Sequence, residues 1–106
     1  MVEQVYRLSG GDSKVIEKVL LDGNIHYLHM ILGTGDGLPE HYTNSNVYMT
    51  VLRGKLTIAL DGSPAHEYDP GTLLKIPDKT LMNVTNRHTG TLEIIVVKSP
   101  APGAVR

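Results

Sequence analysis

The five histidines are the residues of this chain best suited to chemistry, because an imidazole can bind a divalent metal or exchange a proton near neutral pH. A metal site needs roughly three or four protein ligands. The chain has no Cys to supply thiolates. Folding therefore has to bring several imidazoles or oxygen ligands together if a metal is held. The histidines are His26, His29, His41, His66 and His88.

The elements that position these side chains are predicted to be strands. Gly, Pro, Asn and Asp recur at short intervals, and the segments between them are too short for ordinary helices. Many short strands with frequent turns favour a β-sandwich or a closed barrel, in which few strand edges stay exposed. All five aromatic residues are Tyr, so the core is expected to be aliphatic. The predicted strands are residues 14–21, 25–32, 47–52, 55–60, 65–68, 72–76, 81–85 and 91–98, with a ninth over residues 2–6.

His26 and His29 lie in one predicted strand, where their odd separation sends them to opposite faces. At most one of them points into a barrel. His29 shares its face with Tyr27, whereas His26 shares its face with Leu28. The alternation alone does not decide which face is inside.

The segment around His41 resembles the first sequence motif of the cupin family, which places a Gly, two His, a Glu and a second Gly at fixed spacing. Gly35, His41 and Gly54 match that motif. Thr43 stands where the second His would be, and Val47 stands where the Glu would be. The resemblance therefore includes the motif's framework and one of its three metal ligands.

The segment between residues 71 and 86 is similar to the second cupin motif. Gly71 and Pro77 fit its beginning and Asn86 fits its end, but Lys79 replaces a Gly and Met82 replaces the His. The resemblance, closest to the cupin 2 conserved-barrel type, implies an all-β fold: a small double-stranded β-helix, or jelly-roll barrel. Residues 1–98 would form a single cupin barrel, followed by a Pro-rich C-terminal tail over residues 99–106.

In typical cupins the two His and the Glu of the first motif, with the His of the second, hold a divalent transition metal. His41 alone remains of those four, and Val and Met are poor ligands for such a cation. A rebuilt site would combine His41 with His26 or His29 and an oxygen ligand. His41 and His29 are thus the candidate metal ligands, and a divalent transition metal is the cofactor that this resemblance leaves open.

The resemblance and the period-two alternation of strands together predict a pocket inside the barrel. It would be mostly apolar, with a few polar groups at one end, as small-molecule sites commonly are. An alternative is that the same apolar side chains fill a closed core, as they do in many small barrels. His41 would then be a partly exposed residue at a loop-to-strand junction. The predicted pocket residues are His41, Thr43, Val47, Met49, Met82 and Asn86.

Three functions follow from this interpretation. The first is a small-molecule-binding or sensing barrel that lacks the full standard metal site, with a small organic molecule as partner. The second is a metal-dependent cupin enzyme, of the oxygenase or isomerase class, that uses His41 and non-standard ligands. The third is a structural dimerisation module. Cupins commonly pair through their outer sheets, and residues 92–98 are apolar on both faces, so a homodimer is expected.

The bulk composition argues against other partners. A net charge of −1 gives no electrostatic footprint for nucleic acid. No apolar run approaches the roughly 20 residues of a membrane span, and the N-terminal residues lack the pattern of a signal peptide. We therefore expect a cytoplasmic protein that binds neither nucleic acid nor membrane.

Overall fold

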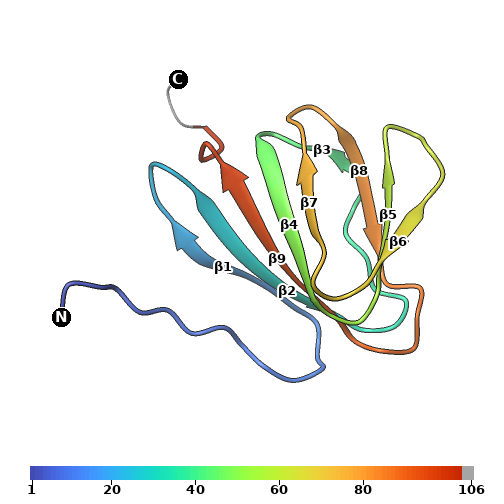
Figure 1. The fold of residues 1–106 in the computed structure, drawn as a ribbon, viewed down its shortest axis with the longest axis horizontal. Helices are drawn as coiled ribbons and strands as arrows, with labels where there is room; N and C mark the ends of the chain where they lie inside the picture. Colours follow the sequence, from blue (N-terminus) through green and yellow to red (C-terminus); the bar gives the residue numbers. More distant parts are fainter. Residues whose placement is uncertain (104–106) are drawn as a thin grey trace.

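The computed structural model describes residues 1–103, which form nine strands joined by loops and no helix (Figure 1). Within these residues, no helix has the length and hydropathy needed to cross a membrane. The strands are β1 (Val15–Leu21), β2 (His26–Leu32), β3 (His41–Tyr42), β4 (Asn46–Arg53), β5 (Leu56–Leu60), β6 (His66–Tyr68), β7 (Leu73–Ile76), β8 (Leu81–Thr85) and β9 (Leu92–Ser99).

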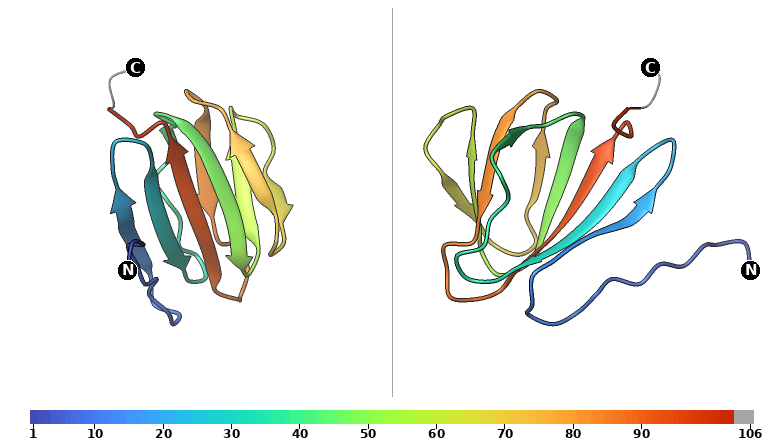
Figure 2. Two further views of the ribbon diagram at one scale, coloured as in Figure 1. Left: turned by 60° about the vertical axis from the view of Figure 1, so that its left-hand side comes forward. Right: turned by 180° about the vertical axis from the view of Figure 1, so that it is seen from behind.

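The strands form two antiparallel sheets that face each other (Figure 2). Sheet A has the order β1-β2-β9-β4-β7, and sheet B has the order β3-β8-β5-β6. The chain passes from sheet A to sheet B three times, between β2 and β3, between β4 and β5, and between β7 and β8. It returns to sheet A between β3 and β4, between β6 and β7, and between β8 and β9. The fold is thus the all-β double-stranded barrel that the sequence predicts.

The predicted strands agree with the observed ones at both ends to within about a residue, apart from the ninth. Residues 2–6 form no strand, because no other strand lies beside them and all of them are exposed. The ninth strand is instead β3, whose two residues pair with β8. Two residues are too few to show an alternating pattern, so β3 was missed.

The core between the sheets is aliphatic, as the absence of Phe and Trp predicts. On β4 the alternation is clear: Val47, Met49 and Val51 are buried, while Tyr48 and Thr50 are half-buried on the other face. The buried cluster comprises Leu28, Met30, Leu32, Val47, Met49, Val51, Leu56, Ile58, Ile76, Met82, Val84, Leu92, Ile94 and Val96.

Gly54, the last residue of the first motif, is required by its surroundings in the turn between β4 and β5. Its φ of +78° lies in the left-handed region that favours Gly. A Cβ added there would lie 2.2 Å from the carbonyl oxygen of Thr91. The motif glycine therefore lets this turn press directly against the start of β9.

The N-terminal segment is fastened to the outer face of sheet A, the face turned away from the barrel. The backbone N–H of Ser9 donates to Glu17 at 2.8 Å, and its hydroxyl donates at 2.7 Å. Arg53 Nη1 donates to Asp12 at 2.8 Å. Residues 9–12 therefore lie across this face, and the exposed segment before them runs on beside β1 (Figure 2).

The described part of the C-terminal tail, up to residue 103, begins against the barrel. The backbone N–H of Ala101 donates to the carbonyl of Asn24 at 3.0 Å. The hydroxyl of Ser45 donates to the carbonyl of Pro100. Ala101 is buried in consequence. The predicted tail over residues 99–106 also includes residues 104–106, which lie outside the described residues.

Candidate ligand site at the mouth of the barrel

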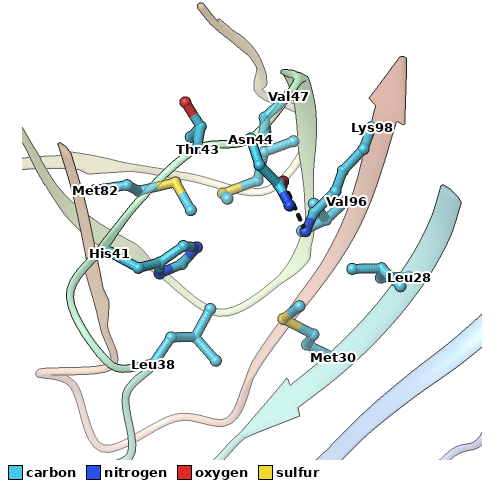
Figure 3. A pocket seen from close by; sticks show the side chains of 11 residues that line it. Leu28, Met30, Leu38, His41, Thr43, Asn44, Val47, Met82, Val96 and Lys98 are labelled. Atoms are coloured by element: carbon cyan, nitrogen blue, oxygen red, sulfur yellow. Dashed lines mark hydrogen bonds between the residues drawn. The ribbon is translucent and has the colours of Figure 1, made fainter. Parts of the chain in front are cut away.

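A hollow lies between the two sheets, bounded by β2, β4, β8, β9 and the loop around β3 (Figure 3). Five of the six predicted pocket residues line it: His41, Thr43, Val47, Met49 and Met82. The full lining is Leu28, Met30, Leu38, His41, Thr43, Asn44, Val47, Met49, Met82, Val96 and Lys98.

The hollow is small and mostly apolar. Its volume is about 40 Å³. A water molecule takes about 10–15 Å³ on this measure, so the space fits about three water-sized groups. Side chains fill most of the remaining barrel. Met30, Met49 and Met82 all line the hollow, and methionine side chains can shift to fit a guest. The space suits a small molecule or the tip of a larger one.

His41 stands at the open side of this hollow. Its residue is exposed, yet its ring points into the hollow (Figure 3). Nδ1 donates to the carbonyl of Pro39 at 2.8 Å, and because a carbonyl only accepts, Nδ1 carries a proton. Within residues 1–103, Nε2 has no hydrogen-bond partner. Nε2 is therefore available to a ligand.

Thr43, at the position of the second motif His, holds the loop between β7 and β8. Its hydroxyl donates to the carbonyl of Pro77 at 2.8 Å and accepts from the backbone N–H of Thr80 at 2.9 Å. Its backbone N–H donates to the carbonyl of Thr80. The side chain lines the hollow, but its hydroxyl already donates one hydrogen bond and accepts another within the protein.

Asn86, the sixth predicted pocket residue, does not line the hollow. Its amide Nδ2 donates to the carbonyls of Leu32 at 3.0 Å and Gly90 at 2.8 Å, and its Oδ1 accepts from the backbone N–H of His88 at 3.0 Å. Asn86 lies past the end of β8, where these backbone groups need partners. It therefore fastens the loop after β8 to the end of β2.

The structure separates the two histidines of β2. Leu28 and Met30 belong to the barrel core, so His26 shares the inward face and His29 lies on the outer face of sheet A. His29 Nδ1 lies 2.7 Å from Glu17 and its Nε2 lies 2.6 Å from Glu93. The predicted metal candidates His41 and His29 are thus on opposite sides of the sheet.

The environment of His29 is a closed ionic cluster. Its side chain is 0% exposed, and each ring nitrogen faces a carboxylate, which accepts when ionised. Both nitrogens must then donate, so the ring is a cation in this arrangement. Glu93 also accepts from Arg53 Nε at 3.1 Å. Glu93 is not at an exposed sheet edge, because β9 is a central strand of sheet A.

Glu17 is held as the anion by this cluster. The backbone N–H and hydroxyl of Ser9, followed by His29, lower the pKa of Glu17 from 4.5 to about 2. The N-terminal segment and the buried imidazole thus stabilise the same carboxylate.

Sequence reasoning missed Lys98, which also lines the hollow. It follows Ile94 and Val96 on the inward face of β9. A lysine on the inward face of a central strand is unusual, and that position is the signal that indicates it. Asn44 also lines the hollow, and its Oδ1 accepts from Lys98 Nζ at 3.5 Å (Figure 3).

The residues at the four motif positions do not fit the metal that cupins typically hold. They are an imidazole at His41, a committed hydroxyl at Thr43, an alkyl group at Val47 and a thioether at Met82. Among residues 1–103, no group of three or more His, Asp or Glu side chains could hold a metal ion. His26 lines a neighbouring hollow rather than this one.

The two facing antiparallel sheets, with the motif residues at the mouth, define a cupin-type double-stranded β-helix. No protein-family model matches the chain. An uncharacterized protein of Methanocaldococcus jannaschii is 32% identical over 103 residues, spanning 96% of this chain and 89% of that protein. Its crystal structure is that of an RmlC-like cupin family protein with a double-stranded β-helix fold, and it matches with a TM-score of 0.93 over 96% of this chain and 94% of the other. The chain belongs to the RmlC-like cupin family.

More distant structures share the fold alone. A cupin superfamily protein of Desulfitobacterium hafniense has a TM-score of 0.74 at 11% identity, over 88% of this chain and 83% of its own. A cupin 2 conserved barrel domain protein of Salinispora arenicola has a TM-score of 0.70 at 13% identity, over 86% and 79% respectively.

Proposed function

We propose that this cupin barrel binds a small molecule at its mouth without the standard metal site. The observation that carries the proposal is the arrangement of the hollow. Its walls are apolar, and the polar groups at its opening are the unpartnered His41 Nε2 and the side chains of Asn44 and Lys98, which share one long hydrogen bond. A ligand would place an apolar tip inside and meet these groups with its polar end.

The metal-dependent enzyme is the weaker alternative, because His41 has no partner ligands among residues 1–103. Elemental analysis of protein purified without added metal or chelator tests it. We expect no stoichiometric transition metal. A bound metal that disappears in a His41→Ala variant would favour the enzyme over the binding barrel.

The methionines give a direct test of ligand binding. Met30, Met49 and Met82 line the hollow, whereas Met1 is exposed at the N-terminus. NMR spectra of protein labelled at the methionine methyl groups would therefore report the hollow through three signals and supply an internal control through the fourth. On addition of pentanol, pentanamide or pentanoate, we expect at least one compound to shift the three signals and leave Met1 unmoved.

A pair of histidine variants controls this experiment. His41→Ala should weaken the binding, while His66→Ala, an exposed residue of β6 that does not line the hollow, should leave it unchanged. If none of the three compounds moves the methyl signals of the hollow, or if Met1 moves equally, the proposal is wrong.

A second proposal is homodimerisation through the outer face of sheet A, with a second copy of the chain as the occupant. An apolar groove of about 390 Å³ lies there, lined by Tyr6, Leu8, Val19, Leu20 and Tyr27. The arm, residues 1–7, supplies Tyr6 to the lining of this groove and leaves Val2 fully exposed and Val5 61% exposed. Because arm and groove lie on the same side of the sheet, a two-fold axis can place each arm in the partner's groove.

Light scattering at micromolar concentration tests the dimer. We expect a dimeric mass for the full chain and a monomeric mass after deletion of residues 1–7. A Leu73→Asp variant changes an exposed apolar residue on the same outer face without touching the arm, and we expect it to weaken the dimer too. A monomeric full chain would contradict this proposal and leave ligand binding untouched.

A further inference from the structure

A second hollow of about 170 Å³ adjoins the first at the open side of the barrel. Leu28, Asn44 and Lys98 line both hollows, so the two share a wall. Beyond this wall the second hollow is lined by Lys18 and His26. It is therefore bordered by three side chains that can carry positive charge, and none of its lining residues is acidic.

The strand register explains why these side chains meet. His26 of β2 lies directly opposite Lys98 of β9, and Lys18 of β1 lies opposite Leu28 of β2. Directly opposed residues of antiparallel strands point to the same face of the sheet. Lys18, His26 and Lys98 thus all lie on the inner face, where β1 and β2 extend past the apolar hollow.

The two lysines have no counter-charge in the part of the chain that the structure describes. Neither forms an ion pair there, although Lys55 and Arg53 each find a carboxylate. Asp22, in the turn near His26, accepts the backbone N–H groups of Asn24 and Ile25.

Lys98 in particular stands in an environment that disfavours its charge. It is half-buried, and its contact with Asn44 is long at 3.5 Å. Burial, and then the charge of Lys18, lower the pKa of Lys98. Water around a fully exposed lysine would weaken both the cost of burial and the repulsion from a neighbouring charge. A bound anion would relieve both, because it would replace lost water and neutralise the facing charges.

We propose that the ligand of the barrel mouth carries an oxyanion, a carboxylate or a phosphate, which Lys98 and Lys18 hold beside His26 while its apolar part enters the first hollow. The inference rests on the proposed binding function and names the class of ligand. Because Leu28, Asn44 and Lys98 line both hollows, a ligand held at these side chains would contact both.

Matched ligands test the anion directly. Pentanoate, monobutyl phosphate and pentanamide share a short apolar chain and differ in the charge of the head group. By titration of the methionine methyl signals, we expect at least one of the two anions to bind roughly tenfold more tightly than the neutral amide, the size of a charge-assisted hydrogen bond. Added salt should reduce this advantage. Preference for pentanoate identifies a carboxylate, and preference for monobutyl phosphate identifies a phosphate.

Lysine variants locate the anion. Lys98→Met and Lys18→Met keep most of the apolar stem, and each should reduce the advantage of the anion over the amide. Lys18 is exposed, so its variant tests the proposal even if Lys98→Met fails to fold. Lys75→Met, a lysine on the outer face of sheet A, should change nothing.

The outcomes separate the two proposals. If pentanamide binds as tightly as both anions, or if the lysine variants leave the advantage unchanged, the anion site is wrong while the barrel still binds a small molecule. If neither these three ligands nor pentanol moves the methyl signals of the hollow, the binding function itself fails.

Discussion

The mouth of the barrel and the outer face of sheet A each hold a histidine, and the two histidines differ in almost every physical respect. His41 at the mouth is exposed, and one of its ring nitrogens has no partner within residues 1–103. His29 on the outer face is fully buried, with a carboxylate on each ring nitrogen. His29 therefore contributes to the stability of the fold, whereas His41 is free to contact a ligand.

The surrounding charges follow the same division. On the outer face, Arg53 and His29 are each matched to carboxylates, and Glu93 contacts both. On the inner face, Lys18 and Lys98 line one hollow, and neither forms an ion pair with a carboxylate in the described part of the chain. Paired opposite charges stabilise the fold without a ligand. The repulsion between two like charges that lie together is reduced when an anion binds between them. This contrast between the faces is the reason for placing the ligand inside the barrel.

The largest expected effect comes from His29→Ala. It leaves Glu17 and Glu93 facing each other without their shared cation, and removing one member of a buried ionic cluster costs on the order of 3 kcal/mol. Urea unfolding measures this loss. Adding Glu17→Gln to the variant should return part of the stability, since one stranded carboxylate is removed. If His29→Ala lowers the free energy of unfolding by no more than His41→Ala does, the two histidines do not differ in their contribution to stability.

A smaller effect is expected from Asn86→Ala, which removes a motif residue whose amide binds backbone groups outside the hollow. The substitution leaves the carbonyls of Leu32 and Gly90 without their amide donor. An unmet buried acceptor costs about 2 kcal/mol, measured by the same urea unfolding. The methyl titration of the folded variant should give unchanged ligand affinity. If the variant loses ligand affinity while its free energy of unfolding is unchanged, Asn86 belongs to the binding site after all.

The features that could be predicted from the sequence are those with local signals. Alternating burial, turn residues and the Gly54 position indicated the barrel, and motif spacing indicated His41. The partners of His29 lie 12 and 64 residues away, and only the pairing of β1, β2 and β9 brings them together. For Asn86, alternation predicted its burial but not the backbone groups that its amide binds. Lys98 carried a usable signal, because it is a charged residue on an inward-facing position.

Acid should remove the stability that Glu17 contributes on the outer face. The pKa of Glu17 is lowered from 4.5 to about 2, so the folded state binds its proton less readily than the unfolded state. Glu17 therefore contributes stability above pH 4.5, and this contribution is lost as the pH falls toward about 2. In Glu17→Gln the urea midpoint should depend less on pH across this window. Glu40→Gln, beside His41 and exposed, should leave the dependence as it is.

The smallest effect on stability is expected from His41→Ala. It tests whether the histidine at the mouth serves ligand binding and not the stability of the fold. The ring is exposed and its single hydrogen bond joins it to the nearby carbonyl of Pro39, so unfolding should change by no more than about 0.5 kcal/mol. Ligand affinity should fall instead, because Nε2 is lost from the opening of the hollow. Urea unfolding and methyl titration on one sample measure both quantities. A His41→Ala variant that loses stability but keeps its affinity would show that the histidine at the mouth supports the barrel, as His29 supports the outer face.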